Sequence, residues 1–429
     1  MTARADAPAY RWVPRGLVAL AALVVASPCP GAAQARPPRA QAPDTAPRAR
    51  PPRTVGPAHF VPSSDYWSFY LLPLPTYNRL EGLGVALTGG WRKSAPQGAV
   101  PTGISIEPSA EISTSGTRGA QLLFDEQGRW HDWRLLLIAG SLREQRAPYF
   151  GLGNRSVIAD SLTDAYGIAY STYSLLRTTG IAAVRRRIAG PFQVLAGAQW
   201  RHYRARPLAD HRSRLGDDLA AGVPLDTGST DGLEVRAGLL YDTRDEEASP
   251  TRGVFAEALV ARGLASGPGK LPYTRYAFGL REFIPIAEYT SLAFRQSVEM
   301  ADGDLPFFVS DERLTSWRPE DGFGGVTSLR AHLPGRFTAP NKALLSADLR
   351  YRWWDFWLTP TTPVRLWLLA FADVGRVWGN GERFSLDHLH PGGGVGTRLQ
   401  IGRGGIFGFD LGWSPDAHLD FTTALSLAY

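Results

Sequence analysis

The stretch VRLWLLAFADVGRVW, residues 364–378, alternates between two kinds of side chain with a period of two residues. The even positions are apolar: Val364, Leu366, Leu368, Ala370, Ala372 and Val374. The odd positions include Arg365, Asp373 and Gly375. Successive side chains of a β-strand point to opposite faces, so this period predicts a strand with one apolar face and one polar face.

The same alternation occurs in other segments of the chain. Between 343 and 353 the odd positions are Ala343, Leu345, Ala347, Leu349, Tyr351 and Trp353, and the even ones include Ser346, Asp348, Arg350 and Arg352. In the last segment Leu419, Phe421, Leu425, Leu427 and Tyr429 share one face. A soluble sandwich that buries its apolar face and a membrane barrel that turns it to lipid both alternate in this way.

Three features favour the membrane barrel. The apolar faces are strongly lipophilic in segment after segment. Aromatic residues gather at segment ends, as an interfacial girdle would: Trp353, Trp354, Phe356, Trp357, Trp378 and Trp413. The chain ends inside a predicted strand on Tyr429, which we expect to be a barrel-targeting aromatic. Strands in lipid must close on themselves, because the bilayer satisfies no free backbone groups.

The predicted fold class is therefore all-β, an antiparallel transmembrane β-barrel of sixteen strands. The strands are expected near 79–91, 102–114, 117–125, 130–142, 165–175, 178–189, 191–204, 231–243, 252–263, 272–285, 288–300, 342–355, 364–377, 391–402, 405–414 and 419–429. Short turns then fall on the periplasmic side and long links on the outer side, as in bacterial barrels. The link 143–164 is the exception, since this count places a long link on the periplasmic side.

The first 35 residues have the layout of a secretion signal. Arg4, Arg11 and Arg15 precede an apolar run, 16–26, and a small-residue exit follows at 31–35. We therefore expect a signal peptide, 1–35, and export to the bacterial outer membrane; an organellar transit peptide is the rival interpretation. The only cysteine, Cys29, lies inside this leader. A lipidated cysteine is the less favoured alternative, because Pro28 precedes it.

Residues 36–58 are rich in proline and arginine and nearly lack large apolar side chains. Such a segment predicts a disordered periplasmic tail, followed by a lead-in segment, 59–76, and the barrel, 77–429. Residues 1–35 carry a net charge of +2 and residues 36–58 a net charge of +4, which accounts for the whole +6 of the chain. The basic balance is therefore no sign of a nucleic-acid surface.

The motifs of enzymes are weak or missing. The glycine run 392–396 lacks the lysine of a phosphate-binding loop and lies in strand-like sequence, where glycine relieves crowding. His388 and His390 have only Asp387 beside them, in an expected outer loop. We therefore expect no enzymatic activity, no metal and no cofactor.

Five motifs, in order along about 350 residues, carry a family resemblance. They are YNRLEGL at 77–83, YDTRD at 241–245 with PTRG at 250–253, the loop 324–337, FADVGRVW at 371–378, and FDLGWS at 409–414. In these the chain resembles the BamA/TamA-type bacterial surface antigen superfamily, barrels that insert or translocate proteins at the outer membrane.

The resemblance implies a specific contact inside the barrel. The long loop between strands eleven and twelve folds into the lumen in that family, and its arginine pairs with acidic residues on the wall. The matching residues are Arg330, Asp348 and Asp373, with Gly324 and Gly325 at the turn of the loop. Strand parity independently sends both aspartates inward, although unrelated lumenal charges are the alternative. The chain departs from the family in having Ala331 and His332 where glycine and an aromatic residue are usual.

The function implied is a part in assembling or translocating proteins, or lipids, at the outer membrane. No periplasmic POTRA domain fits before the barrel, so a barrel-only member is expected. Its partners are then outer-membrane lipid, the assembly machinery during its own insertion, and a separately encoded periplasmic protein. The alternative is a passive pore or a structural barrel without insertase activity.

Overall fold

The computed structural model describes residues 53–55, 67–94, 102–127, 132–158, 162, 165, 167–266, 272–359, 362–401, 405–416 and 418–426. Residues 50–429 form one compact unit. The predicted signal peptide, most of the predicted tail and Tyr429 lie outside the described residues. No helix in the described ranges combines the length and the apolar character needed to cross a membrane.

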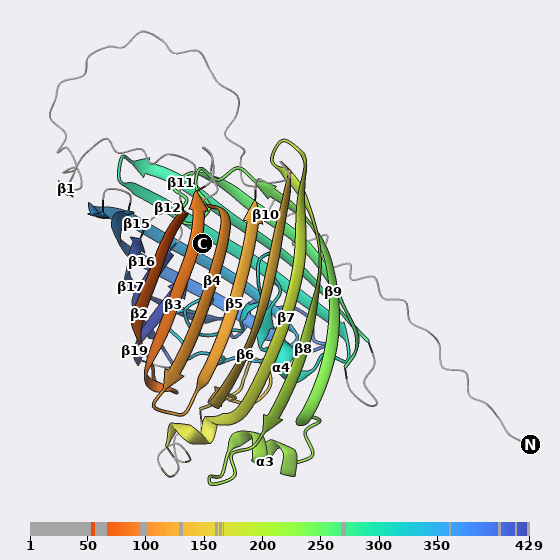
Figure 1. Cartoon of the computed structure of the whole chain (residues 1–429). Helices are drawn as coiled ribbons and strands as arrows, with labels where there is room; N and C mark the ends of the chain where they lie inside the picture. Colours follow the sequence, from red (N-terminus) through yellow and green to blue (C-terminus); the bar gives the residue numbers. More distant parts are fainter. Residues whose placement is uncertain are drawn as a thin grey trace, which may run out of the picture. The chain divides into compact units, whose positions relative to one another are not determined.

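The described chain is dominated by one antiparallel sheet. Its long strands are β2 (Trp67–Asn78), β3 (Gly82–Ser94), β4 (Thr102–Ser113), β5 (Arg118–Gln127), β6 (Trp133–Pro148), β7 (Thr172–Ala189), β8 (Phe192–Arg206), β9 (Gly228–Asp242), β10 (Gly253–Ser266), β11 (Tyr273–Ala287), β12 (Thr290–Gly303), β15 (Asn341–Thr359), β16 (Thr362–Trp378), β17 (His390–Ile401), β18 (Gly405–Ser414) and β19 (His418–Ser426). Each pairs with the next along the chain, β9 pairs with β10, and β19 lies next to β2. Figure 1 shows these strands wrapping round a common interior.

Shorter elements complete the unit. They are β1 (Arg53–Val55), the 3₁₀ helix η1 (Ile168–Ser171), α3 (Arg214–Ala220), α4 (Phe307–Ser310), β13 (Glu312–Arg313) and β14 (Glu320–Asp321). β1 runs parallel to β15, and β13 and β14 form a small hairpin between β12 and β15.

The side-chain alternation predicted from the sequence is confirmed on β15 and β16. Ser346 and Asp348 are buried, whereas Leu345 and Leu349 are exposed on the other face. On β16 Asp373 is buried and Leu368 is exposed. The β15–β16 ladder places Ser346 opposite Asp373, so both aspartates lie on the inner face of adjacent strands.

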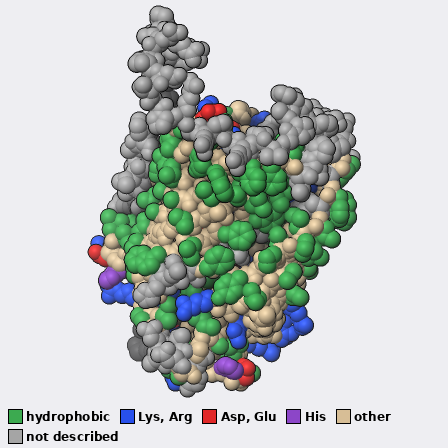
Figure 2. All heavy atoms as spheres, turned by 90° about the vertical axis from the view of Figure 1, so that its left-hand side faces the viewer, with side chains coloured by type: hydrophobic (Ala, Val, Ile, Leu, Met, Phe, Trp, Pro, Cys, Tyr) green, Lys and Arg blue, Asp and Glu red, His purple; other side chains and the backbone are tan. Residues whose placement is uncertain are grey.

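The distribution of apolar and charged side chains over the two faces of the sheet is the reverse of that in a soluble β-sandwich. Large apolar side chains such as Leu83, Ile112 and Leu239 are more than 60% exposed on the outer face. Arg275 and Glu234, by contrast, are buried inside. Figure 2 shows hydrophobic side chains spread over one outer face of the sheet. Apolar side chains outside and charged ones inside are the arrangement of a barrel in lipid.

Two details of the predicted strands are wrong. The segment 165–175 is not a strand of its own, because Gly167 has a φ of 69° and residues 168–171 form η1. β7 begins only at Thr172 and includes the segment 178–189. Conversely, β2 begins at Trp67, inside the segment expected to be a lead-in. Its prolines, Pro73 and Pro75, concealed it, because proline is rare in strand interiors.

The corrected strands remove the exception at the link 143–164. Alternating strand directions place the connections 149–171, 207–227, 304–340 and 379–389 at one end of the sheet. The connections 190–191, 243–252 and 288–289 lie at the other end. The four longest connections therefore share one end, and the predicted placement of 143–164 with the short turns is wrong.

Candidate functional site

The connection 304–340 between β12 and β15, called here the inner loop, packs inside the sheet. Phe307 and Phe308 of α4 join a buried cluster with Tyr149, Tyr173 and Tyr203. Farther along, the loop residues Phe323, Leu329 and Phe337 pack with Leu344 of β15 and Val377 of β16. The loop thus extends the apolar clusters of an interior that also holds many buried charged side chains.

Gly324 and Gly325 shape the turn that presents Arg330. Their φ angles are 113° and 83°, in a region that favours glycine. A Cβ on Gly324 would lie 2.0 Å from the carbonyl oxygen of Leu333. The Gly325 N–H donates to the His332 carbonyl at 2.9 Å, and the Gly324 N–H donates to Ser328 Oγ at 3.0 Å. These bonds close a compact turn whose far side carries Arg330.

Arg330 meets both predicted aspartates. Its Nη2 donates to Asp348 Oδ1 at 2.6 Å and to Asp373 Oδ1 at 2.6 Å. Its Nε and its backbone N–H donate to Asp373 Oδ2 at 2.9 and 3.0 Å. The guanidinium also lies 4.1 Å from the ring centre of Phe371. The structure therefore brings Arg330, Asp348 and Asp373, called here the Arg330 cluster, into one buried group.

The charges of the cluster compensate one another. Arg350 Nη2 donates to Asp348 Oδ2 at 3.1 Å, so two guanidinium groups face two carboxylates. Burial by itself lowers the pKa of Arg330, but Asp348 and Asp373 outweigh it and raise the pKa above its ordinary value. Arg330 therefore stays charged, and charge-assisted hydrogen bonds hold the loop to β15 and β16.

Glycines on the wall let the inner loop approach closely. A Cβ on Gly412 would lie 2.7 Å from Ala331 Cα, and one on Gly392 would lie 2.8 Å from Ala331 Cβ. A Cβ on Gly375 would meet the ring of Phe323 at 2.7 Å. The sequence suggested that Gly392 relieves crowding within the strand. The structure shows that it also makes room for the inner loop.

Ala331 and His332 stand where the family that the chain resembles usually has glycine and an aromatic residue. Both side chains are accommodated between the inner loop and the wall. Ala331 is fully buried against the glycines just described. His332 Nε2 lies 3.2 Å from the Pro391 carbonyl oxygen, and its ring centre lies 5.4 Å from that of Phe337. The imidazole thus takes part in ring packing at this position.

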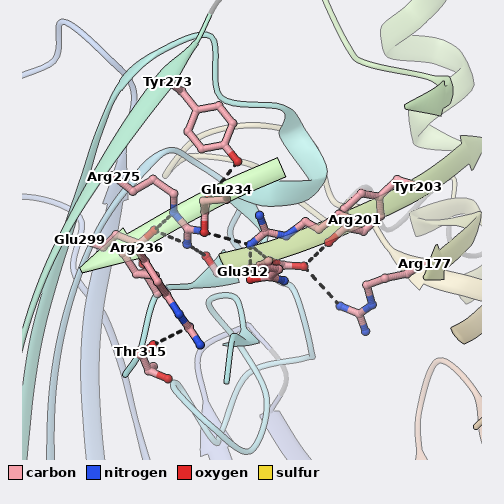
Figure 3. Close-up of polar contacts among 12 residues, drawn as sticks. Arg177, Arg201, Tyr203, Glu234, Arg236, Tyr273, Arg275, Glu299, Glu312 and Thr315 are labelled. Carbon is pink, nitrogen blue, oxygen red and sulfur yellow. Dashed lines mark hydrogen bonds and ion pairs between the residues drawn. The ribbon is translucent and has the colours of Figure 1, made fainter. Parts of the chain in front are cut away.

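A second anchor, not predicted from the sequence, holds the first half of the inner loop (Figure 3). Arg201 Nη2 donates to Glu312 Oε2 at 3.1 Å, and the hydroxyl of Tyr203 donates to Glu312 Oε1. Arg275 Nη2 donates to the Glu312 carbonyl at 2.9 Å and to Glu299 Oε1 at 2.6 Å. We call this group the Glu312 network.

The backbone beyond Glu312 is bonded to the wall as well. The Leu314 N–H donates to Glu299 Oε2 at 2.7 Å, and the Ser316 N–H donates to Glu257 Oε2 at 2.9 Å. Arg236 Nη1 donates to the Thr315 carbonyl at 3.1 Å, and Figure 3 shows it reaching the loop from β9. Wall side chains therefore satisfy loop backbone groups that would otherwise be buried without partners.

The wall residues of the Glu312 network occupy inward positions of predicted strands. They are Arg201 and Tyr203 on β8, Arg275 on β11 and Glu299 on β12, together with Glu234 on β9, which joins the network by accepting from Arg201 Nη2 at 3.3 Å. Strand parity was the available signal, and it could have placed each of them inside. It could not pair them, because pairing depends on strand register and on the path of the loop.

The histidines considered in the sequence have other neighbours. Asn154 Nδ2 donates to the His388 carbonyl at 2.8 Å, and the His390 ring stacks on Phe337 with centroids 3.7 Å apart. Asp387 accepts a hydrogen bond at its carbonyl from Arg376. In the part of the chain that the structure describes, no group of three or more His, Cys, Asp or Glu residues could hold a metal ion.

Comparison with known proteins places this geometry in context. A sequence profile of the Omp85 superfamily domain matches residues 146–417. The structure is similar to BamA from Haemophilus ducreyi lacking POTRA domains 1–3, with a TM-score of 0.51 and 13% identity, over 84% of this chain and 70% of that one. It is similar to CdiB from Escherichia coli with a TM-score of 0.51 and 11% identity, over 86% of this chain and 64% of that one. At such identities the likeness concerns the fold. The curated proteins give no match to this sequence.

Proposed function

Because the chain belongs to the Omp85 superfamily of outer-membrane β-barrels, we propose that it takes part in assembling or translocating proteins at the bacterial outer membrane. The observation that carries the proposal is the inner loop, which is bonded to the wall at the Arg330 cluster and at the Glu312 network. An interior occupied by a bonded loop suits a barrel that acts through its wall better than one that serves as a wide channel.

The barrel consists of sixteen strands, β2–β12 and β15–β19. The sheet order supports closure, since β19 lies next to β2 and β9 pairs with β10. The end of the sheet where β2 begins and β19 ends faces the periplasm, and the end with the four longest connections faces outward. The exposed apolar face contacts outer-membrane lipid, after export directed by residues 1–35.

The seam between β2 and β19 is the part of the wall that opens. Pro73 and Pro75 lie within the β2–β3 ladder, opposite Leu87 and Val85. A proline nitrogen has no hydrogen to donate to a partner strand. Within the β2–β3 ladder a proline therefore fits only where its nitrogen points away from β3. Both nitrogens therefore face β19, and this edge of β2 lacks two donors. A seam with fewer hydrogen bonds separates more easily and offers an edge to an incoming strand.

A reversible cross-link across the seam tests the proposal. Tyr77 on β2 and Phe421 on β19 have ring centroids 6.5 Å apart. The double variant Tyr77→Cys/Phe421→Cys is bridged with a bis-methanethiosulfonate reagent, which forms reducible disulfides, and is reconstituted into liposomes. A urea-unfolded outer-membrane barrel protein is added, and its folding is followed by heat-modifiable gel migration. The unbridged protein should speed folding several-fold over empty liposomes, the bridged protein should not, and reductant should restore the effect.

The matched control places the same cross-link inside a hairpin. Phe69 and Trp91 lie opposite each other on β2 and β3, with ring centroids 5.2 Å apart. Bridging Phe69→Cys/Trp91→Cys should leave the activity unchanged. Equal activity of the bridged and unbridged seam variants would rule out seam opening as the mechanism. If the unbridged protein does not speed the folding of the added barrel protein, the assembly function is ruled out for that client.

The second candidate function is a passive pore, favoured by the charged interior. Single-channel recordings in planar bilayers distinguish the two. A plugged barrel should give small flickering currents, whereas a steady, large, ion-selective current would favour the pore.

A further inference from the structure

A cavity of about 160 Å³ lies between the inner loop and the inner faces of the strands. Eight arginines and four carboxylates contribute to its lining, so guanidinium groups outnumber carboxylates by two to one. A single water needs roughly 10–15 Å³ of such space. The volume therefore suffices for several waters or for a small polyatomic anion. We call it the arginine cavity.

Several of these arginines already have acidic partners. Arg330 and Arg350 share Asp348 within the Arg330 cluster. Arg281 lies 3.5 Å from Glu320, and Arg398 makes two bonds to Asp410 at 2.6 and 2.8 Å. The acidic groups near these arginines are thus committed to them.

Three others, Arg185, Arg295 and Arg318, have no such partner among the described residues, and the first two are buried or bonded only to neutral groups. Arg295 on β12 reaches only the Ser328 carbonyl and Ser346 Oγ, at 3.5 and 3.4 Å. Arg185 on β7 is buried; its Nη2 donates to the Ser316 carbonyl at 2.9 Å and to Ser316 Oγ at 3.4 Å, and its guanidinium lies 5.0 Å from the ring centre of Trp317. Within the described residues, no carboxylate forms an ion pair with either guanidinium. Each faces the arginine cavity with donors free for a further acceptor.

A guanidinium that leaves water without a counter-ion loses hydration that neutral carbonyl groups only partly replace. An anion in the cavity restores the balance and accepts charge-assisted hydrogen bonds. Because the planar guanidinium fork matches phosphate oxygens, and because two such groups line one space, a doubly charged phosphate group fits this chemistry better than a halide.

We propose that the arginine cavity binds a phosphate group, held by Arg295 and Arg185. This site is independent of the proposed function. A second cavity of about 90 Å³ is also lined by Arg185, Arg244 and Glu247 and extends to Asp132 and Gln193, beside the short connections of the sheet. The anion therefore enters from that end, either as free phosphate or as the phosphate of a lipid headgroup.

Titration calorimetry on the mature protein in a non-ionic detergent tests the site with inorganic phosphate, at constant ionic strength. The wild type should bind with a stoichiometry of one. Arg295→Gln and Arg185→Gln should each weaken binding by about tenfold or more, as expected for loss of a charged donor. Arg295→Lys, which keeps the charge, should weaken it less. Arg204→Gln changes an exposed arginine outside the cavity and should bind like the wild type.

A second arm identifies the source of the phosphate. The protein is placed in phosphatidylcholine nanodiscs with or without phosphatidic acid, and thermal unfolding is recorded for the wild type, Arg295→Gln and Arg204→Gln. Binding of free phosphate that depends on Arg295 supports a soluble anion. Stabilisation only by phosphatidic acid, lost in Arg295→Gln, supports a headgroup. The absence of both effects, or equal effects in Arg295→Gln and Arg204→Gln, would overturn the site.

Discussion

Asp373 accepts from both the backbone and the side chain of Arg330. The backbone N–H lies 3.0 Å from Oδ2, Nε lies 2.9 Å from the same oxygen, and Nη2 lies 2.6 Å from Oδ1. A carboxylate bonded in this way fixes both the position of the loop backbone and the orientation of the guanidinium. Asp348 then supplies the second charge, from the neighbouring strand.

Charge reversal at this pair should destabilise the barrel strongly. Arg330→Glu places three carboxylates together in a buried site, and breaking a buried ion pair costs about 3–5 kcal/mol. Heat-modifiable migration on gels should show unfolding at a lower temperature. Combining Arg330→Glu with Asp373→Arg or Asp348→Arg should recover part of the loss, whereas Arg204→Glu should have little effect. If neither combination recovers any stability, the ion pairs do not hold the loop.

A side chain at Gly412 should push the inner loop away from β18. The Cβ of Gly412→Ala would lie 2.7 Å from Ala331 Cα, a backbone atom that cannot turn aside. Overpacking of this kind costs about 1–3 kcal/mol. Unfolding in urea should show the loss. The control is Gly180→Ala on β7, where the nearest atom would be 3.9 Å away. Equal midpoints for the two variants would show that the loop does not rest on this glycine.

Stability should fall as the pH rises through the neutral range, because of Asp311 in the inner loop. Burial, and next the nearby Asp321 carboxylate, raise the pKa of Asp311 to about 8. The folded protein therefore keeps a proton that the unfolded chain has lost above about pH 4. Between these two pKa values the stability falls by up to about 1.4 kcal/mol per pH unit from this group.

The variant Asp311→Asn isolates that contribution, since it keeps the shape of the neutral carboxyl group. Urea midpoints measured between pH 5 and pH 8 should decline less steeply in Asp311→Asn than in the wild type. Parallel declines in the two proteins would assign the pH dependence to other groups.

The alternation of side chains along each strand predicts much of this fold, because a membrane strand has one apolar face and one polar face and both are visible in the sequence. It placed Asp348 and Asp373 inside, and the structure agrees. The sequence does not predict β2, because proline is rare in strand interiors; Pro73 and Pro75 are tolerated there because their nitrogens face the seam. Only the family resemblance points to Arg330, because the side chains of a loop follow no regular period. The Glu312 network could not be predicted, because it joins β8, β11 and β12 through a loop residue.

The two anchors of the inner loop should contribute independently. The ion pairs of Glu312 are made with Arg177 and Arg201, and those of Arg330 with Asp348 and Asp373, so the two sets share no residue. Glu312→Gln should cost about 1–3 kcal/mol, because Arg201 and Tyr203 lose a charged acceptor. Effects without shared partners add to within about 0.5 kcal/mol. Glu312→Gln/Arg330→Gln should therefore lose the sum of the single losses, measured as free energies of unfolding in urea. A double variant that loses no more than Arg330→Gln alone would show that one anchor holds the loop only when the other is formed.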